Sequence, residues 1–313
     1  MKRLLTNVLL FHKDSEILKL LFNNIDYYKN VSRIIYSECK DYQDELVEKR
    51  NKINYMSLSE TLKIVKDFLK DINPTYPILL EELINNGVVN IYDITDEKKF
   101  KEYGDEAYYA RYNGNHTINI PLYHDINDAF TIVHEFMHYI VYLNGVSVDG
   151  FLFTEAISIS HEMLFYDYLK QNKLYEEYLS SPIALRLLSI KDKSNAMLNV
   201  IKEYENERSK SFMLTTLDED SEEASKNFYD LSAKIIYLTG ETLAIQIYYY
   251  YKLGLITIED LQELIRLINN NEHLESLNLI FKSIPTTEDI RESIIYIRNE
   301  LLKKCEKTIK LQK

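Results

Sequence analysis

The chain has few residues that break regular structure, with only 7 glycines and 5 prolines among 313 residues. Tight turns depend on these two residue types, so their scarcity argues against a sheet built from many short hairpins. Leucine, lysine and glutamate are abundant instead, and they favour long helices. Hydrophobic residues make up 46% of the chain, enough to fill a sizeable core. We therefore predict a mostly α protein with a small β-sheet, in the α+β class.

The chain also has fewer basic than acidic residues and no long apolar runs. The 37 Lys and Arg residues face 49 Asp and Glu residues, which gives a formal net charge of -12. A surface of this sign repels phosphate backbones and anionic lipids. No apolar run approaches the roughly 20 residues that a membrane-spanning helix requires. We therefore expect neither nucleic acid nor a membrane as a partner.

Cysteine is nearly absent, because the chain contains only Cys39 and Cys305. They lie far apart and neither has a partner at CxxC spacing, which argues against a disulfide framework and a cysteine metal site. This usage fits the reducing cytoplasm. The opening MKRLLTNVLLFHKDSE has a basic start and a short apolar run, but charged residues interrupt it and no small-residue cleavage site follows. We interpret it as an ordinary N-terminal segment, with secretion as the less favoured alternative.

No repeat, low-complexity stretch or flexible linker divides the sequence. We expect one compact unit overall, with an N-terminal helical appendage over residues 1–52 and the main domain over residues 53–313. Three short β-branched or aromatic runs, at 87–94, 106–112 and 116–123, predict the strands of one small sheet. Apolar residues at helical spacing predict the main domain's helices over approximately 57–73, 77–86, 127–144, 153–171, 183–206, 224–253, 258–269 and 286–304.

The segment DAFTIVHEFMHYIVYL contains the motif HExxH, formed by His134, Glu135 and His138. Residues four apart lie on one face of a helix, so both imidazoles can reach one cation while Glu135 flanks the same pocket. This arrangement suits zinc, with Glu135 as a general base. The alternative is a helix whose two histidines make ordinary hydrogen bonds.

A catalytic zinc site usually has three protein ligands and an open position. The following segment, FTEAISISHEMLFYDYL, offers Glu155, Ser158 and Glu162 on one helical face, whereas His161 points away from that face. We therefore predict Glu155 as the third ligand. Ser158 and Glu162 are candidates for hydrogen bonds that orient the metal-binding imidazoles, and the alternative for Glu162 is a solvated helix charge. His161 is interpreted as a surface or packing residue.

HEFMH followed by FTEAISISHEML resembles the oligopeptidase F and thimet oligopeptidase family of zinc endopeptidases. SLSETLKIVKDFLKDINPTY resembles the helix before that family's catalytic core, and the likeness covers about residues 45–255. The resemblance implies a zincin-like core of long helices, with a short sheet that has an antiparallel edge before the HExxH helix. It also implies one Zn²⁺ per chain, held by His134, His138 and Glu155, with Glu135 as the base.

Two departures from the family stand out. The family carries a histidine and tyrosines on a late helix, whereas the matching stretch IIYLTGETLAIQIYYYYKLG has no histidine. Donation to the oxyanion would therefore fall to tyrosine, and we favour Tyr248 over Tyr237; the alternative is a tyrosine-rich helix in the core. The chain also lacks room for the family's full N-terminal lobe. The channel is therefore expected to be shallower, or completed by a partner or a second copy in a homo-oligomer.

The function predicted from these features is hydrolysis of short unstructured peptides by an endopeptidase. A substrate peptide can add as a strand to an exposed sheet edge, so the strand before the HExxH helix offers candidate substrate-binding residues, namely Asn119, Ile120, Pro121 and Leu122. A plain structural strand is the alternative there. Two other functions remain open: a catalytically silent peptide-binding protein with the same fold, and a zinc hydrolase acting on a non-peptide amide.

Overall fold

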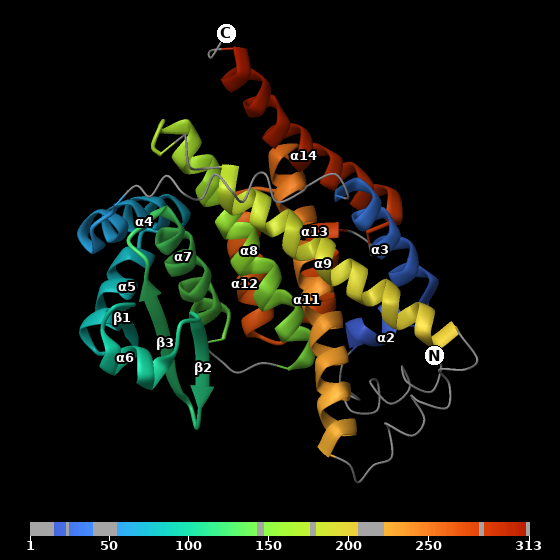
Figure 1. Cartoon of the computed structure of the whole chain (residues 1–313), viewed down its shortest axis with the longest axis horizontal. Helices are drawn as coiled ribbons and strands as arrows, with labels where there is room; N and C mark the ends of the chain where they lie inside the picture. The colour runs from blue at the N-terminus through green and yellow to red at the C-terminus, as the bar shows by residue number, and fades with distance from the viewer. Residues whose placement is uncertain are drawn as a thin grey trace. The chain divides into compact units, whose positions relative to one another are not determined.

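A computed structural model shows a mostly helical chain with one three-stranded sheet, which confirms the predicted α+β class (Figure 1). The backbone contacts group the chain into unit 1 (residues 1–43, 144–156 and 185–313) and unit 2 (residues 44–143 and 157–184). The predicted boundary at residue 52 lies outside the described residues, so that division stays a prediction. The structure describes residues 16–22, 25–39, 55–142, 147–175, 180–205, 222–281 and 285–310.

Unit 2 begins with two helices, α4 (Leu58–Ile72) and α5 (Tyr76–Asn85). Ser57 caps α4, because its hydroxyl accepts the Glu60 N–H at 3.3 Å while the Glu60 carboxylate accepts the Ser57 N–H at 2.9 Å. This reciprocal pair satisfies two backbone donors that the first helical turn leaves without partners. The apolar stripe of α4 faces inward, and Phe68 packs on Phe165 with ring centroids 5.0 Å apart.

The sheet of unit 2 has the order β1-β3-β2. Its strands are β1 (Val89–Asp93), β2 (Tyr108–Tyr112) and β3 (Asn115–Leu122), close to the three predicted runs. β1 pairs parallel to β3 and β2 pairs antiparallel to β3, so the sheet is mixed. A short helix, α6 (Glu97–Tyr103), lies between β1 and β2 in the chain and was not predicted.

The position of β3 corrects one prediction. We expected an exposed edge at Asn119, Ile120, Pro121 and Leu122, but β3 is the middle strand and these residues are buried. Asn119 pairs with Asn90 of β1 and with Tyr108 of β2. Its backbone groups are therefore used on both sides, which leaves no place for strand addition there. The sheet edges belong to β1 and β2.

α7 (Ile126–Val141) follows β3 and packs against it in unit 2 (Figure 1). Asp125 caps this helix by accepting the Asn127 N–H at 2.7 Å. α8 (Val148–Gln171) then crosses from unit 1 into unit 2 as one continuous helix, five residues earlier than the predicted start. In unit 2, Phe130 of α7 packs edge-on against Phe165 of α8 at 4.9 Å, which joins the two helices.

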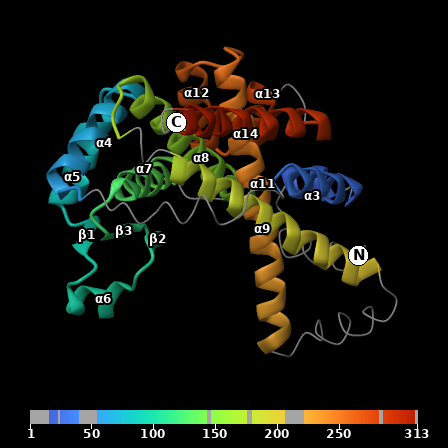
Figure 2. The same cartoon turned by 45° about the horizontal axis from the view of Figure 1, so that its top comes forward.

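Unit 1 is built around α11 (Glu222–Lys252), which packs against α14 (Thr287–Lys310), while α3 (Ile25–Cys39) also lies on α14 (Figure 2). The small helix α2 (Glu16–Phe22) precedes α3. α9 (Ser180–Glu205) and α12 (Ile258–Asn269) were predicted, whereas α13 (His273–Phe281) was not.

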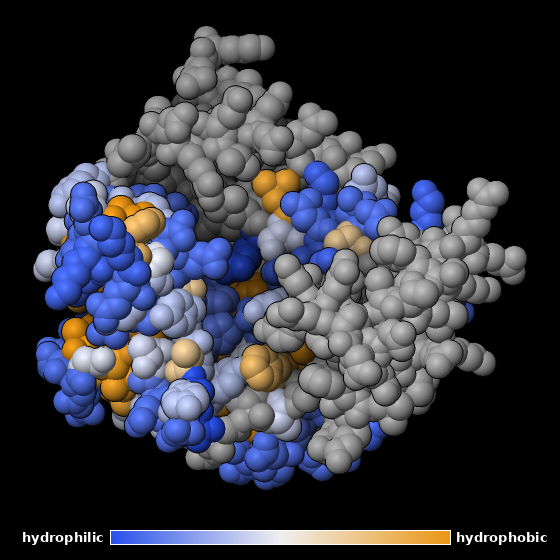
Figure 3. Space-filling model, turned by 60° about the horizontal axis from the view of Figure 1, so that its bottom comes forward, coloured by the Kyte–Doolittle hydropathy of each residue, from blue (hydrophilic) through white to orange (hydrophobic). Residues whose placement is uncertain are grey.

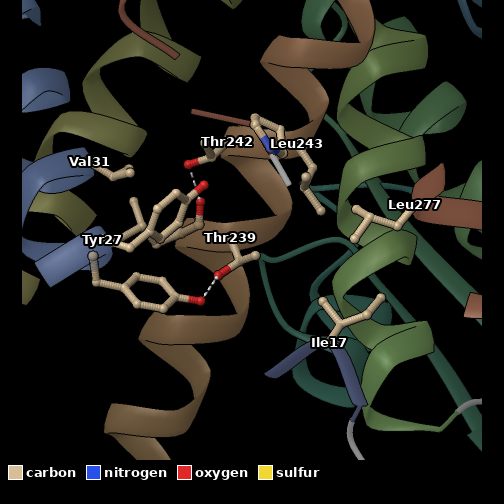
Figure 4. A pocket seen from close by; sticks show the side chains of 10 residues that line it. Ile17, Tyr27, Val31, Thr239, Thr242, Leu243 and Leu277 are labelled. Carbon is tan, nitrogen blue, oxygen red and sulfur yellow. Dashed lines mark hydrogen bonds between the residues drawn. The ribbon is translucent and has the colours of Figure 1, made fainter. Parts of the chain in front are cut away.

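An apolar pocket in unit 1 lies between α2, α3, α11 and α13 (Figure 4). Tyr28 reaches across it, and its hydroxyl lies 2.9 Å from the Thr239 hydroxyl of α11. Ile17 and Leu277 line the same space from α2 and α13. The early helices are thus joined to α11, which carries the predicted oxyanion tyrosines.

The exposed apolar side chains of the described residues are scattered. On the face in Figure 3, hydrophobic residues occur in small groups among hydrophilic ones. Scattered exposed apolar residues are normal for a globular surface. Among the described helices, none combines the length and apolar character that crossing a membrane demands.

Candidate metal centre

The HExxH motif lies in the second half of α7, where His134 and His138 share a face as their spacing predicted. Their Nε2 atoms are 2.9 Å apart and their rings are nearly perpendicular, at 86°. His138 is 8% exposed and Glu135, beside His134, is 6% exposed. The two imidazoles therefore aim their Nε2 atoms at one point, with a buried carboxylate next to them.

Glu162 of α8 contacts the first of these histidines. Its Oε1 lies 2.5 Å from His134 Nδ1, and both side chains are largely buried. A carboxylate can only accept here, so Nδ1 carries the proton and donates it. In the neutral imidazole, Nε2 then keeps a lone pair. Glu162 thus holds His134 in the tautomer and orientation that metal binding requires.

Glu155 lies two helical turns before Glu162 on the same face of α8, with its side chain half-buried. One ligand atom from each of His134, His138 and Glu155 lies within 4.8 Å of the others. No other group of this kind occurs among the described residues. α8 runs without a break through residue 156, where unit 1 gives way to unit 2, so the helix itself links Glu155 to the segment that packs on α7.

A glycine allows α11 to approach α8 closely at this point in unit 1. A Cβ on Gly240 would lie 2.7 Å from the Glu155 Cβ, closer than Cβ atoms approach in real structures, and a tight 3.0 Å from the Leu152 carbonyl oxygen. Any side chain at this position would therefore require α8 or α11 to shift. Gly240 therefore allows α11 to pack directly against the Cβ of Glu155.

The donor set fits a zinc ion. Two imidazole nitrogens and one carboxylate leave a fourth tetrahedral position open, the arrangement typical of catalytic rather than structural zinc. The convergence of the two Nε2 atoms and the Glu162 contact to His134 are the observations that support the fit.

The remaining residues predicted on α8 are also buried. Ser158 is fully buried, and its hydroxyl has no hydrogen-bond partner among the described residues. His161 is fully buried too, and its Nδ1 donates to the Ile157 carbonyl oxygen at 2.8 Å. Burial lowers the pKa of His161 to about 4. His161 is therefore a neutral packing residue. Of the two roles predicted for it, packing is confirmed and a surface position is wrong.

The two predicted oxyanion tyrosines differ in exposure. Tyr248 of α11 is 4% exposed, and the Lys252 ammonium lies 5.9 Å from the centre of its ring. Tyr237 is 42% exposed, with Lys193 Nζ 5.1 Å from its ring centre. Lys193 also pairs with Glu241, the buried residue that follows Gly240. Both tyrosines thus lie on the helix that packs against Glu155, and their role in the chemistry remains a prediction.

A second polar pair near the motif was missed in the sequence. Tyr109 of β2 and His116 of β3 lie on one face of their hairpin, and the Tyr109 hydroxyl is 2.6 Å from His116 Nδ1. The Tyr109 ring lies 6.4 Å from the His138 ring and 4.9 Å from the Tyr142 ring. Alternation along each strand shows which of its residues share a face, but the β2–β3 register is needed to bring these two side chains together.

Comparisons with known proteins support the fold. No family model matches the chain, and no curated protein matches its sequence. The structure is similar to the crystal structure of a "putative peptidase" from Chlamydophila abortus, with a TM-score of 0.60 and 14% sequence identity. The similarity covers 95% of this chain and 60% of that protein, so the chain spans about three fifths of its length. At this identity the likeness shows a shared fold.

Proposed function

We propose that the chain is a zinc-dependent metallopeptidase that cleaves short unstructured peptides internally. The observation that carries the proposal is the convergence of His134, His138 and Glu155, whose ligand atoms lie within 4.8 Å of one another. The HExxH spacing adds a carboxylate at the position where a base is needed. The fold shared with the chlamydial protein agrees with this reading.

Each residue has a distinct task in the proposed reaction. A bound zinc ion would supply Lewis-acid activation of a water and of the scissile carbonyl. Glu135, buried beside His134, takes the proton from the attacking water and delivers it to the leaving amine. Glu162 keeps the proton of His134 on Nδ1, so that the lone pair of His134 Nε2 would bind the metal. Tyr248, or Tyr237 in its place, donates a hydrogen bond to the carbonyl oxygen as negative charge develops.

The resemblance to the oligopeptidase F and thimet oligopeptidase family extends the proposal to endopeptidase specificity. It rests on HEFMH followed by FTEAISISHEML, the segment that supplies Glu155. The absence of a histidine from the late helix separates this chain from that family. Family membership is thus part of the proposal.

The competing function is a catalytically silent peptide-binding protein. A protein that has lost hydrolysis is expected to lose its base or a ligand first, yet Glu135 and all three ligand positions are intact. Glu135 is also buried next to the histidines. Burying a carboxylate destabilises the folded state, so a protein that no longer needed a base would be expected to replace it. These observations favour an active enzyme.

The test is digestion of an unbiased library of short peptides by the purified full chain. The enzyme is assayed as purified, after removal of metal with a chelator, and after addition of one equivalent of zinc. We expect internal cleavage that chelation abolishes and zinc restores. Peptide binding without cleavage in every state would favour the silent alternative, and cleavage unaffected by chelation would contradict the metal's role.

A further inference from the structure

Three consecutive residues of α11 contact three different helices of unit 1. The Thr239 hydroxyl lies 2.9 Å from the Tyr28 hydroxyl of α3. Gly240 packs against α8, and the Glu241 carboxylate accepts a hydrogen bond from the Ser189 hydroxyl of α9 at 3.0 Å. Contacts from three sides therefore determine where this part of α11 lies.

The contact with α8 involves the predicted metal ligand Glu155. Because Gly240 has no side chain, the backbone of α11 lies against the Cβ of Glu155, where an added Cβ would come within 2.7 Å. A shift between groups packed this closely cannot be absorbed by rotation of a flexible side chain. A displacement of α11 at Gly240 therefore changes the packing that fixes the base of the Glu155 side chain. The ligand atom of Glu155 lies within 4.8 Å of those of His134 and His138, so the geometry offered to a metal changes with it.

The opposite face of α11 borders the apolar pocket between α2, α3, α11 and α13 (Figure 4). Leu238 and Thr242 line this pocket, and each is two residues from Gly240, about 160° around the helix from it. Val31 lines the pocket from α3. Space that no side chain fills leaves α11 with less van der Waals support on this face. The pocket therefore gives α11 room to move away from α8.

The hydrogen bond between Tyr28 and Thr239 lies on this face and has a defined direction. The Thr239 hydroxyl donates to the Ile235 carbonyl oxygen at 2.8 Å, and a hydroxyl has one hydrogen. Tyr28 is therefore the donor in its contact with Thr239. Tyr28 is 4% exposed and Thr239 is 6% exposed, so water has little access to replace either partner. The bond thus stabilises one position of α11 against α3.

A second contact joins the N-terminal helices to α8. Asp149, at the start of α8, accepts the backbone N–H groups of Glu16 and Ile17 at 2.8 and 3.4 Å. These donors belong to the first turn of α2, where a carboxylate is favourable. Asp149 precedes Glu155 by six residues on the same helix. The N-terminal helices α2 and α3 therefore contact both helices that meet at Glu155.

We infer that Tyr28 is a positioning residue of the metal centre: its hydrogen bond to Thr239 holds α11 against α8 and so keeps Glu155 where it can bind zinc. The inference rests on the metal site of the proposed function and does not require peptide hydrolysis. Tyr28 acts through Thr239 and Gly240 and does not bind the metal itself. Without the bond, α11 relaxes into the pocket, and zinc binding has to bring it back.

Replacing Tyr28 by phenylalanine should weaken zinc binding about fivefold, within the value of one hydrogen bond. Thr239→Val should weaken it at least as much, because valine keeps the shape of threonine and cannot accept the Tyr28 proton. Thr239→Ser keeps the acceptor, so it should bind zinc with nearly wild-type affinity. The double variant with Tyr28→Phe and Thr239→Val should bind zinc no more weakly than Thr239→Val alone, since both changes remove the same bond.

Ser293→Ala is the matched control. The buried Ser293 hydroxyl of α14 accepts a hydrogen bond from the side-chain amide of Gln246 at 2.6 Å. Its removal also deletes a buried hydrogen bond to α11, but at a position six residues beyond Gly240. The metal-free forms of Ser293→Ala and Tyr28→Phe should both melt at lower temperatures than wild type, whereas only Tyr28→Phe should lose zinc affinity.

The experiment measures zinc affinity by chelator competition, the melting temperature of the metal-free proteins, and the visible absorption of Co²⁺ bound in place of zinc, which reports ligand geometry. We expect Tyr28→Phe and Thr239→Val to change the Co²⁺ spectrum, and Thr239→Ser and Ser293→Ala to match wild type. Wild-type zinc affinity in Tyr28→Phe, equal losses in Tyr28→Phe and Ser293→Ala, or equal losses in Thr239→Ser and Thr239→Val would overturn the inference.

Peptide digestion by the same proteins separates this inference from the proposed function. If the chain binds zinc with the Tyr28 dependence described but cleaves no peptide, the positioning role stands and the peptidase activity does not. If it cleaves peptides with zinc and every variant matches wild type, only the positioning role fails. A wild-type chain that binds no zinc would overturn both.

Discussion

The carboxylate of Glu162 lies 2.5 Å from Nδ1 of His134, which joins two residues that are 28 positions apart in the chain. This contact orients one imidazole of the candidate metal centre before any metal is bound. A carboxylate behind a metal-binding histidine also raises the basicity of the ligand. The centre is therefore preorganised by a residue that does not itself belong to the ligand set.

Replacing Glu162 by glutamine should weaken zinc binding about 10- to 100-fold, because the amide cannot match the charge of the carboxylate against Nδ1–H. Competition with a chromophoric chelator measures the affinity. Ser160→Ala, on the same helix, removes a buried hydroxyl that bonds the Ile157 carbonyl oxygen and should leave zinc affinity unchanged. Equal affinities for Glu162→Gln and Ser160→Ala would show that the contact does not support the metal.

A methyl group on Gly240 should disturb the centre through Glu155. Alanine gains about 1 kcal/mol in helix propensity over glycine. Its Cβ, however, would meet the Glu155 Cβ at 2.7 Å and the Leu152 carbonyl oxygen at 3.0 Å, neither of which is the end of a flexible side chain. Overpacking of this kind costs about 1–3 kcal/mol, so we expect Gly240→Ala to be less stable and to bind zinc more weakly. Higher thermal stability with unchanged zinc affinity would contradict the close packing.

The ion pair between His124 and Asp93 should make stability depend on pH. His124 Nε2 lies 2.7 Å from Asp93 Oδ2, and hydrogen bonding to that carboxylate raises the pKa of His124. Because the pKa of His124 is higher in the folded state than in the unfolded state, the pair stabilises the fold fully at pH values below the unfolded-state pKa near 6.5. This stabilisation is lost as the pH rises through the folded-state pKa of His124. Hydrogen bonds from Thr95 and His124 lower the pKa of Asp93, so its contribution disappears only in acid, below about pH 4.

His124→Asn tests this pair, because asparagine tolerates the positive φ of 61° at that position. We expect wild type to exceed the variant in melting temperature by the largest margin between pH 4.5 and 6.5, with the margin shrinking toward pH 9. The measurement uses metal-free protein, since titration of the zinc ligands would otherwise add its own pH dependence. A margin that does not change with pH would rule out an ionic contribution.

Replacing Tyr248 and replacing Tyr237, both on α11, should lower turnover to different extents. Removing one donor to the oxyanion typically lowers kcat about a hundredfold or more while leaving ground-state binding intact. We expect this loss for Tyr248→Phe and a smaller one for Tyr237→Phe, each with unchanged KM and zinc content. Near-wild-type turnover in both variants would leave these tyrosines as packing residues and the donor unidentified.

The parts of the centre that lie on single helices could be predicted from the sequence, because helical spacing determines which residues share a face. His134 and His138 at i and i+4, and Glu155 and Glu162 at i and i+7, follow from this rule alone. The short elements α6 and α13 were missed, since seven and nine residues carry little periodic signal.

The order of the strands could not be predicted in the same way. Strand pairing depends on contacts between distant segments, and β3 lies between β1 and β2 although it follows both in the chain. For this reason the expected edge at Asn119 was wrong. The pairing of Tyr109 with His116 was missed for the same reason, because it requires the β2–β3 register to be known.

The central claim is that His134, His138 and Glu155 hold a hydrolytic zinc ion with Glu135 as the base. Metal analysis and peptide hydrolysis, measured together on wild type, Glu135→Gln, Glu155→Ala and His161→Ala, test it most directly. We predict about one zinc per chain in wild type, Glu135→Gln and His161→Ala, a large loss of zinc only in Glu155→Ala, and almost no hydrolysis in Glu135→Gln. Equal zinc loss in Glu155→Ala and His161→Ala, or wild-type turnover in Glu135→Gln, would contradict the claim.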